Sequence, residues 1–131
     1  MSKAKSKTQK KIDNNIRLAL TSACQSMLEE VPGFQWLTHQ ADYTNFPASL
    51  LIICVFDSPD QQLQAESSGK ASQMKRVIQA KLLKTGVKFK SLEQQILLDN
   101  EQVCKQEHQG NWTLRLASYK GRAIGKNRPS Q

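Results

Sequence analysis

The run Leu50-Leu51-Ile52-Ile53-Cys54-Val55-Phe56 decides the fold of this chain. All of its residues are apolar and several are β-branched, a pattern typical of a strand that is covered on both faces. It is also the longest unbroken apolar stretch, far below the ~18 residues that a membrane-spanning helix needs. The sequence therefore predicts a central, doubly covered β-strand and no membrane helix.

Upstream of this run, the pattern predicts a long helix followed by a strand. Apolar residues recur at steps of three and four, which places one apolar stripe on a helix over residues 9–30. Pro32-Gly33 ends this helix. Residues 34–39 then alternate, so Phe34 and Trp36 are expected to share one face of a strand and to pack in the core.

Downstream of the run, shorter elements are expected. They are a polar, exposed loop over residues 57–73, a helix that begins near Ser72 and ends at Gly86, a short strand over residues 87–90, an apolar run at Ile96–Leu98, a helix over residues 101–109 capped by Asp99 or Asn100, and a packed segment over residues 112–116. The fold class that follows is a single two-layer α+β domain. Its sheet is small, mixed or antiparallel, with three to four strands packed against about three helices.

Charge and composition set the predicted boundaries of the domain. The chain has 131 residues, with 19 Lys and Arg against 11 Asp and Glu and a net charge of +8. Residues 1–9 and 118–131 are basic and poor in large apolar side chains, so we expect disordered tails there and a single domain over residues 10–117. Three blocks contain bases and no acid: residues 1–11, 70–90 and 115–131. Such blocks attract polyanions.

The block at residues 70–90 contains the predicted binding site. A helix there presents charges that its packing does not require, and they would dock along a phosphate backbone and position the protein without specifying sequence. The candidate nucleic-acid-binding residues are Lys75, Arg76, Lys81, Lys84, Lys88 and Lys90. Gln73, Arg76 and Gln79 are available for base contacts. The structural alternative is a solvated helix face with tails that only keep the protein soluble.

Other chemistries have weaker patterns. His39, Asp42 and Asp57 are residue types that a hydrolytic site could use, but the sequence contains no glycine-framed serine to act as a nucleophile. It also contains no phosphate-binding loop, so the sequence predicts no enzyme and no cofactor. Cys104 and His108 have helical i, i+4 spacing, but no second ligand pair accompanies them, so no metal is expected. The three cysteines are odd in number and widely spaced, which favours reduced thiols, and no signal peptide is visible. We therefore expect a cytoplasmic protein.

The strings Gly33–His39, Tyr43–Pro47 and Leu50–Asp57, with Glu101–Cys104 and Glu107–Trp112, resemble a family of small uncharacterised bacterial proteins often labelled Fis-family transcriptional regulators. The resemblance covers roughly residues 10–116 and implies membership of a family whose label names transcription regulation and DNA binding but whose chemistry is unknown. The chain lacks a recognisable C-terminal helix-turn-helix, so no functional residue is carried over from that label.

Together these patterns predict a non-enzymatic, nucleic-acid-associated protein that binds DNA or RNA through a basic helix and basic tails, in a regulatory or ribosome-associated role. The alternative is a protein-interaction module, in which the acidic remainder or the aromatic connection around Tyr43 and Phe46 recognises a partner. Those two rings are expected to be the exposed aromatic pair of the domain.

Overall fold

The computed structural model describes residues 7–123. The elements, in chain order, are α1 (Lys7–Glu30), β1 (Phe34–Gln40), the 3-10 turn η1 (Tyr43–Asn45), β2 (Leu51–Phe56), α2 (Pro59–Ser67), α3 (Lys70–Leu83), α4 (Leu92–Gln95), β3 (Ile96–Asn100), α5 (Glu101–His108) and α6 (Trp112–Ala123). Of the two predicted tails, residues 1–6 and 124–131 lie outside the described range, whereas residues 7–9 belong to α1 and residues 118–123 to α6.

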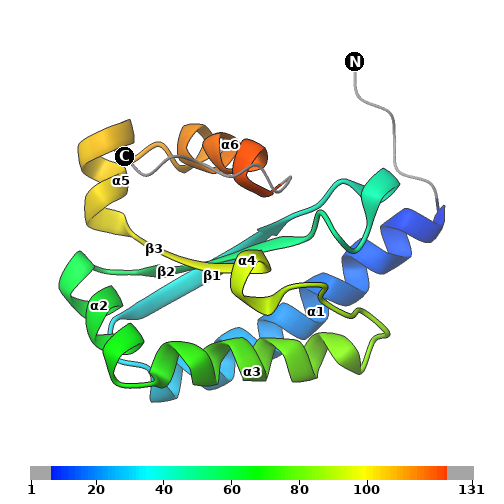
Figure 1. Ribbon diagram of the computed structural model, residues 1–131, viewed down its shortest axis with the longest axis horizontal. Helices are drawn as coiled ribbons and strands as arrows, with labels where there is room; N and C mark the ends of the chain where they lie inside the picture. The colour runs from blue at the N-terminus through cyan, green and yellow to red at the C-terminus, as the bar shows by residue number, and fades with distance from the viewer. Residues whose placement is uncertain (1–6, 124–131) are drawn as a thin grey trace.

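The predicted central strand is confirmed as β2, whose six residues are all buried. It pairs antiparallel with β1 and parallel with β3, which gives a mixed sheet of order β1-β2-β3. Helices α1, α2 and α3 cover one face of the sheet, and α6 with α5 beside it covers the other (Figure 1). The predicted single α+β domain with a mixed sheet is thus confirmed, and a helical layer on the second face completes the burial of β2.

The prediction that Phe34 and Trp36 share a face of β1 is wrong. Phe34 packs in the core beneath the sheet with α1 and α3, whereas Trp36 packs on the α6 face. The cause is a register shift between these two residues, which pair with the consecutive residues Phe56 and Val55 of β2. An extra residue in one strand reverses the alternation of side chains beyond it.

The loop predicted over residues 57–73 is also wrong, because residues 59–67 form helix α2. Ser58 caps this helix by accepting a hydrogen bond from the Gln61 backbone N–H, and Pro59 occupies the first turn, where its missing N–H is not needed. Helix α3 then begins at Lys70, directly after Gly69, whose positive φ of 89° permits the sharp turn between the two helices. Ser72, the expected cap, lies inside α3.

Helix α6 is fixed to the sheet by a buried carboxylate at the end of β3. Asp99 accepts two hydrogen bonds from Arg115, at 2.6 and 2.9 Å, and a third from the Tyr119 hydroxyl. These bonds raise the pKa of Arg115 above its ordinary value. Tyr119 is buried, which corrects the tail predicted from residue 118. Glu101 adds a second clamp by accepting from the indole N–H groups of Trp36 and Trp112.

Residues 84–91 connect α3 to α4 and contain no strand, contrary to the short strand predicted over residues 87–90. The buried side chain of Gln95 fixes this connection. Its amide oxygen accepts from the backbone N–H groups of Lys90 and Ser91, and its amide nitrogen donates to the carbonyls of Pro47 and Leu50. Within the described residues, no helix is both long and apolar enough to cross a membrane.

Candidate nucleic-acid interface

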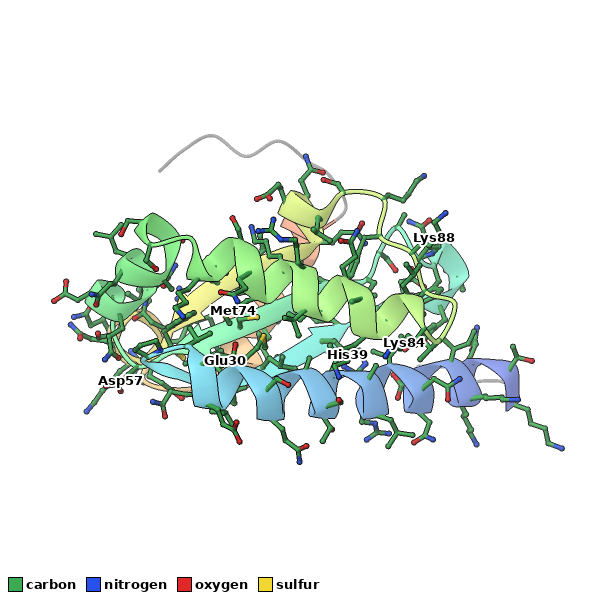
Figure 2. The ribbon with its side chains drawn as sticks, turned by 90° about the horizontal axis from the view of Figure 1, so that it is seen from below. Glu30, His39, Asp57, Met74, Lys84 and Lys88 are labelled. Carbon is green, nitrogen blue, oxygen red and sulfur yellow. The ribbon has the colours of Figure 1, made fainter. Side chains whose placement is uncertain are left out.

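Two basic segments that are far apart in the sequence lie at one end of the molecule. Helices α1 and α3 pack side by side and run in opposite directions, so the start of α1 lies near the end of α3 (Figures 1 and 2). Figure 2 shows Lys84 and Lys88 above the first half of α1. We call this region the basic end; its lysines are Lys7, Lys10, Lys11, Lys81, Lys84, Lys88 and Lys90.

The structure separates the predicted binding residues into two groups. Lys84, Lys88 and Lys90 are exposed at the basic end, with Lys81 half-buried in the last turn of α3. Lys75 instead donates a 2.7 Å hydrogen bond to Glu93, and only 15% of its side chain is exposed. Arg76 lies exposed on α3, one turn from Gln73 and from Gln79, both of which are also exposed.

The lysines of α1 were predicted from composition to belong partly to a tail, and the structure places them in the first turns of a helix. The aligned peptide dipoles make the N-terminal end of a helix positive, so acidic residues are the favourable ones there. The first turn of α1 contains no acid, and residues 7–12 include three lysines. Helix dipole and side chains therefore act with the same sign at the basic end.

The opposite end of the molecule is acidic. Glu29 and Glu30 end α1, Asp57 follows β2, and Asp60 and Glu66 belong to α2; all five are exposed. Glu30 and Asp57 lie at the end away from Lys84 and Lys88 (Figure 2). The five acids thus lie away from the lysines of the basic end, while Lys70 begins α3 beside the acidic end and Asp13 lies near the start of α1. The remaining asymmetry of charge orients the molecule in the field of a polyanion.

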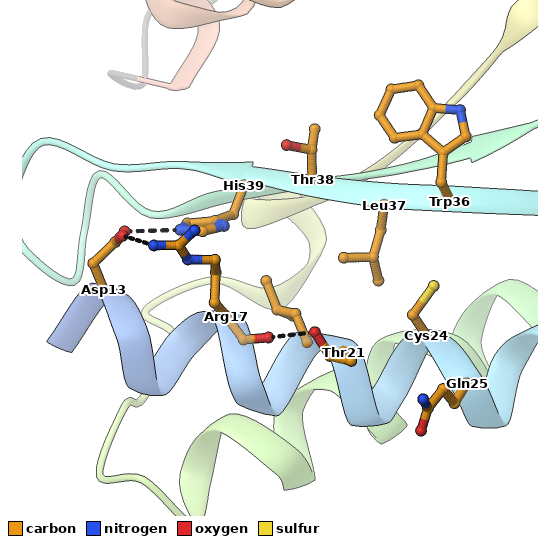
Figure 3. Close-up of a pocket in the computed structure, with 10 residues that line it drawn as sticks. Asp13, Arg17, Thr21, Cys24, Gln25, Trp36, Leu37, Thr38 and His39 are labelled. Atoms are coloured by element: carbon orange, nitrogen blue, oxygen red, sulfur yellow. Dashed lines mark hydrogen bonds and ion pairs between the residues drawn. The ribbon is translucent and has the colours of Figure 1, made fainter. Parts of the chain in front are cut away.

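Of His39, Asp42 and Asp57, only His39 lines the groove between β1 and α1 beside the basic end. His39 does not meet Asp42 or Asp57; its Nε2 lies 3.1 Å from Asp13 Oδ1, which also accepts a 2.6 Å hydrogen bond from the Tyr43 hydroxyl. Partial burial and this bond raise the pKa of Tyr43 above its ordinary value. Figure 3 shows His39 and Arg17 converging on Asp13 across the gap between β1 and α1.

The aromatic pair expected to be exposed is half-buried instead. The rings of Tyr43 and Phe46 lie 5.3 Å apart and pack against the main core. This arrangement removes the simplest platform on which bases would stack.

The three thiols and the side chain of His108 contact other residues of the fold. All three cysteines are free, and burial raises the pKa of the Cys54 thiol to about 12. Cys104 is buried, and His108 Nδ1 lies 3.3 Å from an Arg115 nitrogen. Among residues 7–123, no three His, Cys, Asp or Glu side chains are grouped closely enough to hold a metal ion.

Comparisons with known proteins add no further constraint: no family model matches the chain, and neither a curated protein nor a solved structure does.

Proposed function

We propose that this protein is a non-enzymatic nucleic-acid-associated protein that contacts phosphates through the basic end. The observation that supports this proposal is that the start of α1 lies near the end of α3, which brings the segment of residues 7–11 near the segment of residues 81–90. Neither segment contains an acid, so both contribute positive charge to this end of the molecule. Each phosphate neutralised by a lysine releases condensed counterions, which favours binding and makes it dependent on salt.

The uncompensated start of α1 supports the same proposal. A phosphate near Lys7, Lys10 and Lys11 would supply the negative charge that the helix dipole favours and that the sequence does not provide. The exposed Gln73, Arg76 and Gln79 on α3 are the side chains we assign to base contacts, whereas Lys75, paired with Glu93, is assigned a structural role. Regulation of transcription, which the label of the resembling family names, fits binding of DNA, and the three free thiols fit a cytoplasmic setting.

The experiment that tests this function is charge reversal of two exposed lysines. The full chain with Lys84→Glu and Lys88→Glu is compared with the unmodified protein for binding to duplex DNA, single-stranded DNA and structured RNA across a salt series. We expect at least a tenfold lower affinity and a log–log salt slope smaller by about 2, since each lost phosphate contact removes about 0.9. The preferred polymer then distinguishes a DNA-binding from an RNA-binding role.

A matched control uses Lys105, an exposed lysine in the last turn of α5, on the far side of the sheet from α3. Lys105→Glu should leave affinity for every polymer within about twofold, because salt screens the interaction between exposed charges that lie far apart. Equal losses in the control and in each of the Lys84→Glu and Lys88→Glu single variants would contradict a located site and would favour the alternative, a protein-interaction module.

A second prediction concerns Lys7. Replacing this first residue of α1 with glutamate should raise the free energy of unfolding by about 0.5 kcal/mol, because an acid in the first turn favours the dipole and pairs with Lys11 one turn later. The same change should lower nucleic-acid affinity several-fold. Urea denaturation and binding titrations measure the two effects, and a loss of stability together with unchanged binding would contradict the proposed role of the α1 lysines.

A further inference from the structure

The groove between β1 and α1 has a volume of about 650 Å³ and lies beside the basic end. Figure 3 shows Leu37 and His39 pointing from β1 toward α1. Leu20 and Leu37 give the groove apolar surface, and the Leu37 backbone bonds to the Cys24 thiol, which connects the strand to the helix within the groove. A volume of this size, with apolar walls and a few polar groups, is typical of ligand sites.

A stripe of exposed polar residues runs along α1 from the basic end into this groove. Lys10, Asn14, Arg17, Thr21 and Gln25 follow steps of four, three, four and four, which places them on one face of the helix. All five are exposed, and the last three line the groove. Because a helix rises 1.5 Å per residue, the stripe is about 22 Å long. It therefore connects the lysines at the start of α1 to the middle of the groove.

The acidic and basic side chains that line the groove balance each other. Asp13 and Arg17 form an ion pair at 3.5 Å, so their charges cancel, and a phosphate is not favoured there over a neutral group. Thr21 and Gln25 supply a hydroxyl and an amide, which both donate and accept hydrogen bonds. Beside the apolar surface of Leu37, these groups suit a flat, neutral ring with a polar edge.

A nucleobase is a ring of this kind, and the adjacent basic end suits its phosphates. Amide and hydroxyl side chains bond to the edges of bases, and unpaired bases also offer the edges that a duplex uses for pairing. Paired bases present their remaining edges only within the grooves of the double helix. An unpaired base turned out of the stack is therefore the form that enters a cavity on a protein.

We propose that the groove between β1 and α1 binds unpaired bases of a single-stranded nucleic acid whose phosphates lie along the basic end. Thr21 and Gln25 contact the edges of the bases, and Leu37 contacts their faces. This inference rests on the proposed function, because the lysines hold the strand, and it adds a preference for single strands over duplexes. The α3 side chains assigned to base contacts do not line the groove, so the two sets are tested separately.

Removing the polar groups of the groove without changing its charge tests this proposal. The full chain with Thr21→Leu and Gln25→Leu is compared with the unmodified protein for binding to single-stranded DNA, single-stranded RNA and duplex DNA. We expect about a tenfold lower affinity for single strands, the effect of losing one good base contact. Duplex affinity and the salt slope should not change, since no phosphate contact is lost. The two single-strand measurements show whether the bases are those of DNA or of RNA.

Ser26→Leu is the matched control. Ser26 is exposed on α1 next to Gln25 but does not line the groove. The control makes the same kind of change, from a polar side chain to leucine, and should leave the affinity for every polymer unchanged. An equal loss of single-strand affinity in Ser26→Leu would overturn the proposal, because the effect would then not depend on the groove.

Alkylation of Cys24 supplies a readout that needs no substitution in the groove. Cys24 is half-buried and lines the groove, whereas Cys54 and Cys104 are buried. N-ethylmaleimide should modify Cys24 several-fold more slowly when a single strand is bound, because the bases cover the thiol. A bound duplex should leave the rate unchanged. An unchanged rate with a single strand bound would overturn the proposal.

Failure of this inference is distinguishable from failure of the proposed function. A chain that binds neither single strands nor duplexes contradicts the proposed function, and this inference with it. A chain that binds duplexes at least as tightly as single strands, or whose single-strand affinity survives Thr21→Leu with Gln25→Leu, still binds phosphates at the basic end. Either result would overturn only the assignment of the groove to unpaired bases.

Discussion

Replacing Asp99 with alanine is expected to lower the free energy of unfolding by about 3–5 kcal/mol, the range found when one partner of a buried ion pair is removed. Asp99 is buried at the end of β3 and accepts hydrogen bonds from Arg115 and Tyr119. Without the carboxylate, the guanidinium of Arg115, of whose side chain 12% is exposed, loses its main counter-charge. The expected structural consequence is release of α6 from the second face of the sheet.

Denaturant unfolding followed by tryptophan fluorescence measures this effect, since Trp112 begins α6 and its ring lies 4.9 Å from that of Trp36. Glu107→Gln is the matched control. Glu107 also accepts from Arg115, at 3.0 Å, but its side chain is 61% exposed, so its loss should change stability by less than about 1 kcal/mol. Equal effects of the two substitutions would show that the buried bonds of Asp99 do not hold α6.

The parts of the fold that the sequence predicts are those encoded by local pattern. The apolar run at 50–56 is unambiguous because a strand buried on both faces needs no polar alternation, and the three- and four-residue steps of α1 repeat over many turns. Helix α2 was missed because Ala65 is its one buried residue, so its apolar pattern is weak. Its signal was the cap: serine followed by proline and aspartate at 58–60 is a helix start rather than a loop.

Other features depend on contacts between distant residues. The register shift in β1 separates Phe34 from Trp36, and nothing in a run of alternating residues marks where such a shift occurs. Tyr119 lies in a basic, polar stretch, and its burial follows from Asp99, twenty residues earlier. The predicted end of the domain at residue 117 is therefore too early, because Asp99, the residue that holds α6, belongs to β3.

The candidate interface shows the same division. Counting charges locates the basic block at residues 70–90, but it cannot show that Glu93 pairs with Lys75 or that the start of α1 lies near the end of α3. The pairing of Lys75 with Glu93 depends on where α4 turns back onto α3. The position of the start of α1 depends on the antiparallel packing of α1 and α3, which the apolar stripes permit without specifying direction.

Replacing Gln95 with leucine is expected to lower the free energy of unfolding by about 3 kcal/mol or more. Leucine fills a similar volume, but the backbone N–H groups of residues 90 and 91 and the carbonyl of residue 50 each lose the hydrogen bond from Gln95, and the Pro47 carbonyl keeps only the bond from the Leu50 N–H, at 3.1 Å. A buried backbone group left without a partner costs about 1–3 kcal/mol, and groups near the surface recover part of this by binding water. Urea denaturation of the full chain measures the change.

Gln94→Leu is the control, because the same substitution is made at the adjacent, exposed position and should alter stability by less than about 0.5 kcal/mol.

The comparison also connects stability to the proposed function. Gln95 holds the backbone of Lys90, and the segment from Lys84 to Ser91 presents Lys84, Lys88 and Lys90 at the basic end. In Gln95→Leu these lysines keep their charge but lose a fixed backbone, so nucleic-acid affinity should fall under conditions in which the chain remains folded, while the salt slope stays near that of the unmodified protein. Lysine reversal removes contacts and lowers the slope; loosening the segment adds an ordering cost to the same contacts. If Gln95→Leu unfolds as the unmodified protein does, the four hydrogen bonds do not support this segment in solution.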